Sequence, residues 1–149
     1  MRQSILRYFI SLLLVSLCIC SATSIFIISG SMKEDSEREM MYSVKLIEYN
    51  LDYSKDLNTQ IETLNPLAFS DDTRISVIDE KGQVLADTYK NDISSNHLKR
   101  EEVQQALHSS NHEGYAMRRS ETTNQPLLYA AYYKDNHIVR LSIPYSGVW

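Results

Sequence analysis

Tyrosine and arginine residues recur in the C-terminal third of the chain, and they are the side chains best suited to form a binding site there. Both types offer hydrogen-bond donors of the kind that line ligand pockets, and a guanidinium matches a carboxylate or phosphate with two hydrogen bonds. The alternative is that the tyrosines pack in the core while the arginines face water. We predict a site for a small anionic ligand made of Tyr115, Arg118, Tyr129 and Arg140, with Arg119, Tyr132 and Tyr133 nearby.

Patterns typical of catalysis or metal binding are weak in this sequence. His108 and His112 have the i,i+4 spacing of a helical metal site, but the Ser-Ser-Asn between them indicates that the helix has already ended. The sequence has no Gly-x-Ser-x-Gly motif and no glycine-rich nucleotide loop. The acid pairs Asp71-Asp72 and Glu101-Glu102 are expected to be solvated or to cap a helix. We therefore expect no catalytic residue, metal ion or cofactor in this chain.

An uncharged run of 25 residues, Tyr8 to Met32, lies near the N-terminus. As a helix it would reach about 37 Å, enough to cross a hydrocarbon core of about 30 Å. Arg2 and Arg7 precede it, and the positive-inside rule therefore predicts residues 1–7 in the cytoplasm, a membrane helix over 8–32 and an extracytoplasmic remainder. A cleaved secretory signal or a lipoprotein signal at Cys18 or Cys20 is the alternative. The run is longer than an ordinary signal and lacks a clean small-x-small cleavage site.

The exported part is acidic. All 19 acidic residues follow Met32 together with 13 of the 15 basic ones, which gives this part a net charge of −6. Nucleic acid is an improbable partner because it requires a clustered basic surface. Both cysteines lie within the apolar run, so the exported domain must be stable without disulfides.

A long helical pattern follows the membrane run, and we assign residues 33–65 to a membrane-proximal signalling helix. Its apolar positions, Met40, Val44, Ile47 and Leu51, recur in steps of three and four. This stripe can pack on its own domain, or it can form the seam of a parallel homodimer as in a coiled coil. Asn65-Pro66 is expected to end the helix because the residue before proline avoids the α region.

Residues 66–145 are predicted to form one domain. Two short strands flank a turn that contains Gly82, as in a β-hairpin; a short helix and three further strands follow. His97 is expected to pack or to form a hydrogen bond in the loop before that helix. We predict an α+β fold in which the long helix covers one face of a five-stranded antiparallel sheet. The predicted elements are strands at 75–78 and 84–86, a helix at 100–108, and strands at 115–120, 127–133 and 137–143.

Several short motifs within this domain occur in a familiar order. Arg74-Ile-Ser-Val-Ile-Asp-Glu-Lys-Gly-Gln-Val-Leu-Ala-Asp87 resembles the opening of the extracytoplasmic PAS-like (Cache-type) domain of sensor histidine kinases. Asn96-His97-Leu98, Arg100 and the stretch 102–107 are similar to the motif that follows in phosphate-regulon-type kinases, where a proline often stands in place of Glu101. The stretches 128–131 and 138–144 are similar to the last two strands of the family.

This resemblance implies a sensor between two membrane helices, followed by a phosphoacceptor histidine and an ATP-binding domain. Residues 146–149 would begin the link to the second membrane helix, and the chain would be a truncated product or an excised region that detects but does not catalyse. The protein would interact with a response regulator only through the missing cytoplasmic part. A chemoreceptor or another transducer is an alternative because such domains serve many outputs, as is a stand-alone single-pass protein that binds another extracytoplasmic protein.

The orientation of the chain is testable. Because Arg2 and Arg7 favour a cytoplasmic N-terminus, a cysteine introduced between Lys90 and Asn96 should react with a membrane-impermeant thiol reagent on intact cells. Labelling that requires lysis would contradict the predicted orientation.

Overall fold

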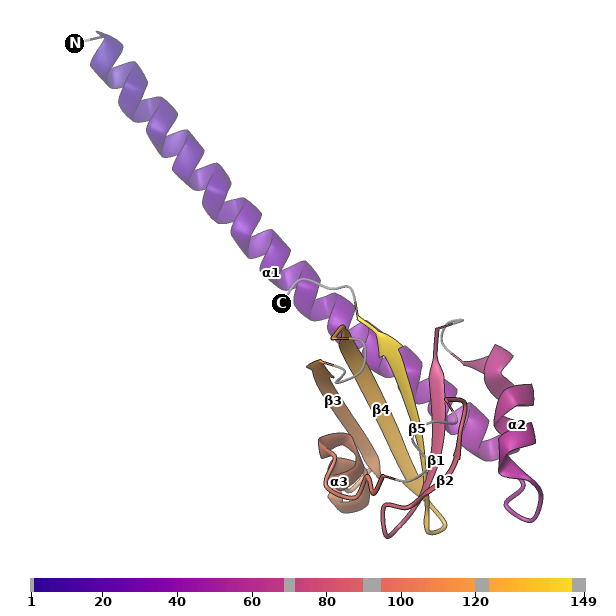
Figure 1. The fold of residues 1–149 in the computed structure, drawn as a ribbon. Coiled ribbons are helices and arrows are strands. Elements are labelled where there is room, and N and C mark those ends of the chain that lie inside the picture. The colour runs from indigo at the N-terminus through magenta and orange to yellow at the C-terminus, as the bar shows by residue number, and fades with distance from the viewer. Residues whose placement is uncertain (1, 69–71, 90–94, 120–123, 146–149) are drawn as a thin grey trace. The chain divides into compact units, whose positions relative to one another are not determined.

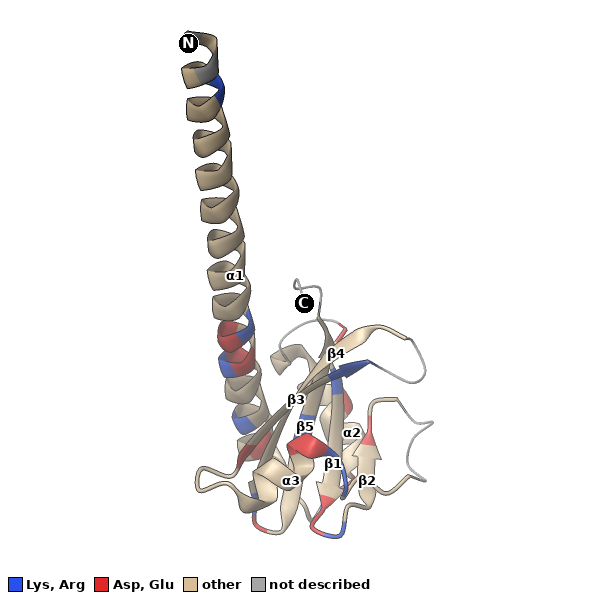
Figure 2. Cartoon of the chain, turned by 90° about the vertical axis from the view of Figure 1, so that its left-hand side faces the viewer, with Lys and Arg blue, Asp and Glu red and all other residues tan. Residues whose placement is uncertain are grey.

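The chain is described here from a computed structural model, which covers residues 2–68, 72–89, 95–119 and 124–145 (Figure 1). Its described residues divide into two compact units, with the boundary between Asp35 and Ser36. Helix α1 (Arg2–Asn50) contributes residues to both. In Figure 2, α1 carries no charged residue between Arg7 and Lys33. By length and composition α1 is able to cross a membrane.

The unit Ser36–Ser146 is built on one five-stranded sheet with the strand order β2-β1-β5-β4-β3 (Figure 1). Every neighbouring pair of strands is antiparallel. The sheet and the helices packed on it confirm the predicted α+β fold. Its strands are β1 (Arg74–Asp79), β2 (Val84–Asp87), β3 (Glu113–Arg119), β4 (Pro126–Lys134) and β5 (His137–Pro144).

The two faces of the sheet are covered by different helices. One face packs against the C-terminal part of α1 and against α2 (Leu57–Leu64), with alternate residues of β5 such as Val139 and Leu141 in this core. The opposite face is covered by α3 (Glu101–His108), whose Val103 and Ala106 pack in a second, smaller core. Successive residues of a strand point to opposite faces, so β5 contributes to both layers.

The predicted helical stripe is part of the core of its own chain. Met40, Val44 and Ile47 are fully buried against the sheet, and Leu51 packs at the edge of this core. Of the two interpretations of the stripe, the structure therefore matches packing on the same domain. These buried side chains cannot also form a seam with a second chain. Ion pairs between Glu48 and Lys134 and between Lys45 and Glu113 also link α1 to the strands.

The single helix predicted as far as Leu64 is wrong, because α1 ends at Asn50 and α2 begins at Leu57. Short acidic side chains bind the backbone between them. Asp52 accepts hydrogen bonds from the backbone N–H and the hydroxyl of Ser54, and Asp56 caps α2 by accepting from the Thr59 N–H at 2.9 Å. Such local bonds compete with the helix and satisfy the free N–H groups of a new one. Helix α2 ends at Leu64, next to the predicted Asn65-Pro66. The expected reason does not hold, because Asn65 stays in the α region (φ −53°, ψ −36°) and the chain continues as the 3-10 turn Asn65–Leu67.

The predicted hairpin between β1 and β2 turns at Gly82, which has a φ of +82°. A Cβ at this position would lie 2.3 Å from the backbone nitrogen of Leu98, so only glycine lets the following loop approach. Asn96 holds that loop, since its amide donates to the Lys81 carbonyl oxygen and its side-chain oxygen accepts from the Leu98 N–H. The motif residues Gly82 and Asn96 thus hold the loop before α3 against the β1–β2 turn.

Part of the loop proposed above for labelling, residues 90–94, lies outside the described residues. Glu80, an exposed residue of the β1–β2 turn, is a described position that serves the same experiment.

Candidate functional site

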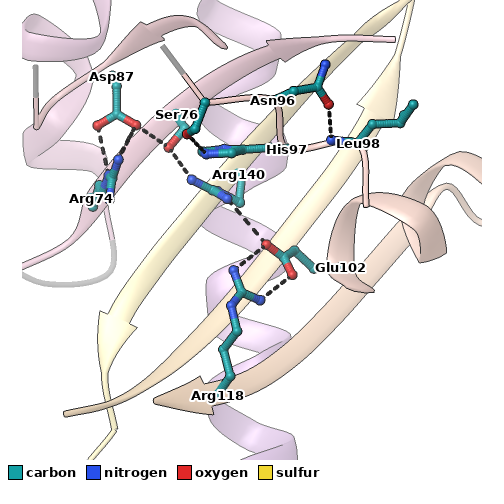
Figure 3. Close-up of polar contacts among 10 residues, drawn as sticks. Arg74, Ser76, Asp87, Asn96, His97, Leu98, Glu102, Arg118 and Arg140 are labelled. Carbon is teal, nitrogen blue, oxygen red and sulfur yellow. Dashed lines mark hydrogen bonds and ion pairs between the residues drawn. The ribbon is translucent and has the colours of Figure 1, made fainter. Parts of the chain in front are cut away.

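Polar and charged side chains gather on the sheet face that α3 covers (Figure 3). Strand register explains why they meet: Ser76 of β1 lies opposite both Asp87 of β2 and Arg140 of β5. Arg118 of β3 and Tyr129 of β4 point to the same face, and α3 adds Glu102. We call this group the α3-face cluster; it consists of Arg74, Ser76, Asp87, Glu102, Arg118, Tyr129 and Arg140.

Glu102 is the centre of this cluster, and its side chain is fully buried. Arg118 donates two hydrogen bonds to its carboxylate, from Nη1 to Oε2 at 2.6 Å and from Nη2 to Oε1 at 3.0 Å. Arg140 Nη1 approaches Oε1 at 3.4 Å. The guanidinium carbon of Arg118 also lies 3.6 Å from the centre of the Tyr129 ring, a cation–π contact. One carboxylate is therefore held by two arginines, and one of these arginines rests on an aromatic ring.

The cluster continues from Arg140 to the edge strand. Arg140 Nη2 donates to the Ser76 hydroxyl oxygen at 3.0 Å, and Ser76 donates to Asp87 at 2.8 Å. Asp87 in turn accepts from Arg74 Nε and Nη2. Three guanidinium groups against two carboxylates leave the cluster with one net positive charge. Arg140 Nε is buried and has no hydrogen-bond partner among the described residues.

Burial and pairing act in opposite directions on the ionisation of these groups. Burial raises the pKa of Glu102, but the hydrogen bond from Arg118 and the charges of Arg118 and Arg140 outweigh it, so the pKa lies below its ordinary 4.5. Burial lowers the pKa of Arg118, but the hydrogen bond to Glu102 and the charge of Glu102 outweigh this effect, so the pKa of Arg118 is raised. Burial lowers the pKa of Arg140. Glu102 is thus ionised at neutral pH.

Of the four predicted ligand residues, the structure brings three together and separates the fourth. Arg118, Tyr129 and Arg140 belong to the α3-face cluster. Tyr115 lies on the α1 side, where it packs against the core and its hydroxyl donates to Glu113 at 3.1 Å. The separation follows from strand geometry: Tyr115 and Arg118 are three positions apart on β3, and an odd spacing places side chains on opposite faces.

Glu102 is the main residue of the cluster that the sequence does not predict. The pair Glu101-Glu102 is expected to be solvated or to cap the helix, yet Glu102 is fully buried beneath α3. The available signal was its spacing, because Glu102 and Ala106 are one helical turn apart and share the inward face. Ser76, Asp87 and Arg74 were also missed, although a serine within a β-branched run indicates a polar partner on the opposite strand.

The histidines have ordinary surroundings. His97 is buried in the loop before α3, with Nε2 2.7 Å from the Ser95 hydroxyl and its backbone N–H on the Gly82 carbonyl oxygen, which confirms the prediction for this residue. His108 Nδ1 lies 2.8 Å from the Gln104 carbonyl oxygen, and the His112 ring meets Tyr133 edge-on. Within the described ranges, no three side chains of His, Cys, Asp or Glu gather as a metal site would require.

The pKa shift of Glu102 gives a pH-dependent prediction. A carboxyl whose pKa is lower in the folded than in the unfolded state adds stability above the unfolded value, 4.5, and loses it as the pH falls through the folded value. At pH 7, Glu102→Gln should lower the free energy of unfolding by about 3 kcal/mol, because it breaks a buried ion pair. This difference from wild type should shrink steadily below pH 4.5.

Urea unfolding of both proteins from pH 7 to pH 3 measures the difference. Glu101→Gln is the matched control, since Glu101 is the exposed neighbour in the same helix turn, and it should change little at any pH. A Glu102→Gln effect that stays constant down to pH 3 would show that the charge of Glu102 does not stabilise the fold.

No protein-family model matches the chain, and no curated protein matches it. Solved structures match its fold. The ligand-binding domain of the Campylobacter jejuni chemoreceptor Tlp3, in complex with 4-methylisoleucine, is similar with a TM-score of 0.56 and 17% identity over 82% of this chain and 56% of that chain. A methyl-accepting chemotaxis protein from Vibrio parahaemolyticus is similar with a TM-score of 0.55 and 19% sequence identity. The match covers 81% of this chain and 96% of that chain.

A third similar structure is the Bacillus subtilis YkuI protein, which has an EAL domain, with a TM-score of 0.59 and 17% identity over 86% of this chain. This chain spans 36% of the YkuI chain and 56% of the Tlp3 chain. At these identities the likeness concerns the fold alone. The α+β fold of residues 36–145 is the PAS-like fold found in chemoreceptor ligand-binding domains.

Proposed function

We propose that this chain is the sensor region of a membrane signal transducer, with residues 36–145 outside the cell and the N-terminus in the cytoplasm. The observation that carries the proposal is the double role of α1. The same helix contains the uncharged run Tyr8–Met32 and supplies Met40, Val44 and Ile47 to the core of the domain. A change in how the domain packs therefore acts on the helix that enters the membrane.

Among transducers, we propose a two-component sensor histidine kinase of the phosphate-regulon type. The support is the set of motifs that resemble this family, whose residues Gly82 and Asn96 hold the loop that leads to α3. A chemoreceptor would use the same fold, and a stand-alone interaction protein remains the third candidate. The reading frame beyond Trp149 distinguishes them: a second apolar run followed by a phosphoacceptor helix supports the kinase, and an immediate stop supports the stand-alone protein.

We propose that the stimulus is a small anion that binds at the α3-face cluster. Its net positive charge and the buried, unpartnered Nε of Arg140 favour an anionic partner. The Tlp3 domain has been solved with L-valine and with L-norvaline, both of which carry a carboxylate. A protein partner on the domain surface is the alternative stimulus.

Thermal melting of the detergent-solubilised chain with a panel of organic acids and phosphate tests this ligand. A ligand at ten times its Kd adds about 1.4 kcal/mol to the free energy of unfolding, which should raise Tm by roughly 5 °C for a domain of this size. Neutral amides of the same acids and sodium chloride at equal ionic strength should have no such effect.

Arg118→Met should abolish the response, and Arg119→Met, at the exposed end of the same strand, should preserve it. If no acid raises Tm at millimolar concentration, the small-anion ligand is excluded over that panel and a protein stimulus is favoured.

We also propose a parallel homodimer, because motion of one helix conveys a signal only relative to a partner. The residues first predicted for the seam are buried in their own domain, so pairing must use the opposite side of α1. Three large side chains are exposed there at four- and three-residue spacing, as in a coiled-coil seam. They are Tyr42, Leu46 and Tyr49, with 77%, 38% and 79% of their surface exposed.

Single cysteines at positions 42, 46 and 49 should therefore form disulfide-linked dimers in membranes, in a chain whose Cys18 and Cys20 are replaced by serine. Cysteines at Val44, which is buried, and at Glu80, which is exposed but lies far along the chain in the β1–β2 turn, are the controls and should not cross-link. Equal cross-linking at all five positions, or at none, would argue against this face as a dimer seam.

A further inference from the structure

The carboxylate of Glu102 is enclosed and hydrogen-bonded by its neighbours in the way that a bound ligand would be. It receives two parallel hydrogen bonds from Arg118, a third, longer contact from Arg140, and no solvent. The Arg118 guanidinium rests on the Tyr129 ring. A forked pair of hydrogen bonds from an arginine is a common means by which proteins recognise a free carboxylate, and an aromatic ring can hold the guanidinium by stacking on it.

The residues around Glu102 form an anion site even without its side chain. Arg118 and Arg140 come from β3 and β5, and their positions are set by the sheet rather than by α3. Removing the Glu102 charge would raise the net charge of the α3-face cluster from one to two positive charges. Buried charges of one sign require a counter-charge, so this site would take up an anion.

Helix α3 is the element that inserts this carboxylate. The helix lies directly on β3 at Gly114, where a Cβ would be 1.9 Å from the Glu102 carbonyl oxygen and 2.7 Å from the Ala106 nitrogen. Two adjacent side chains in the middle of α3 fasten it, since Gln104 donates to the Leu98 carbonyl oxygen and Gln105 accepts from the Tyr115 N–H. With eight residues, α3 is short, and it cannot leave the sheet without withdrawing Glu102 from the two arginines.

We propose that Glu102 is a built-in ligand: α3 closes a carboxylate site on the sheet with its own side chain, and a small carboxylate that enters this site displaces Glu102 and releases α3. Only the biological meaning of this inference rests on the proposed sensing role. The competition between Glu102 and an entering carboxylate is a property of the folded domain itself. Exchange of one carboxylate for another conserves the charge of the cluster, and the difference between the two states is the position of α3.

Chemical rescue tests the built-in ligand. Glu102→Ala removes the carboxylate and leaves a space that matches acetate. At pH 7 and 20 mM, acetate should raise the Tm of detergent-solubilised Glu102→Ala by roughly 5 °C and in a saturable manner. Acetamide at the same concentration and chloride at the same ionic strength should not. Acetate should have no effect on Glu101→Ala, the exposed neighbour, or on the double variant Glu102→Ala/Arg118→Met.

Each outcome decides the inference. If Glu102→Ala is unfolded in chloride, acetate should restore its folded far-UV and near-UV circular dichroism. Glu102→Gln, which fills the space without a charge, is the second variant, and acetate should also raise its Tm. Absence of rescue in both variants, or an equal rise in all proteins, would overturn the built-in ligand. Rescue of Glu102→Ala combined with no response of wild type to the acid panel would support Glu102 as the occupant of a carboxylate site, but it would overturn its displacement by an outside carboxylate and remove the proposed small-anion stimulus.

Discussion

The buried carboxylate of Glu102, held between Arg118 and Arg140, is the interaction on which one whole layer of this domain depends. A buried ion pair is costly to desolvate, and breaking it leaves a buried charge without a partner. Glu102, Arg118 and Arg140 must therefore stay together or separate together. Arg118 and Arg140 are carried by β3 and β5 of one sheet, on either side of β4, and Glu102 is carried by a helix of only eight residues. The geometry therefore makes α3 the movable member, with Gly114 providing the close approach that brings its backbone onto β3.

Strand β5 connects this layer to the other one. Arg140 points to the α3-face cluster, while its neighbours Val139 and Leu141 point to the core that contains Met40, Val44 and Ile47 of α1. A shift of β5 that accommodates a change at Arg140 would be felt in the packing of α1, since interiors are close-packed and transmit strain. In the proposed sensor, α1 is also the helix that crosses the membrane. The sheet would then lie between the α3-face cluster, where the stimulus binds, and α1, which transmits the signal.

The fold was largely predictable from sequence because short strands leave a period-two pattern and glycine marks a turn. The helix break was not predicted because the sequence from Lys33 to Leu64 contains neither proline nor glycine. The deciding residues, Asp52 and Asp56, act by bonding the backbone locally. The site was predicted in part. Arg118, Tyr129 and Arg140 could be grouped by residue type, but which of them share a face depends on strand register, and Tyr115 could have been excluded by counting positions along β3. The spacing of Glu102 from Ala106 could have indicated that Glu102 faces inward, but its pairing with Arg118 and Arg140 depends on how α3 docks on the sheet.

A double-mutant cycle between Glu102 and Arg118 tests the central claim most directly. The free energies of unfolding of wild type, Glu102→Gln, Arg118→Met and the double variant give the coupling energy between the two side chains, free of effects that each substitution has alone. The account predicts a coupling of at least about 1.5 kcal/mol at pH 7, near the middle of the range of about 0.5–3 kcal/mol for residues in one network, and its loss as the pH falls below 4.5. A coupling near zero at pH 7 would show that Glu102 and Arg118 merely lie near each other, and the account of α3 as a helix held by its own carboxylate would be wrong.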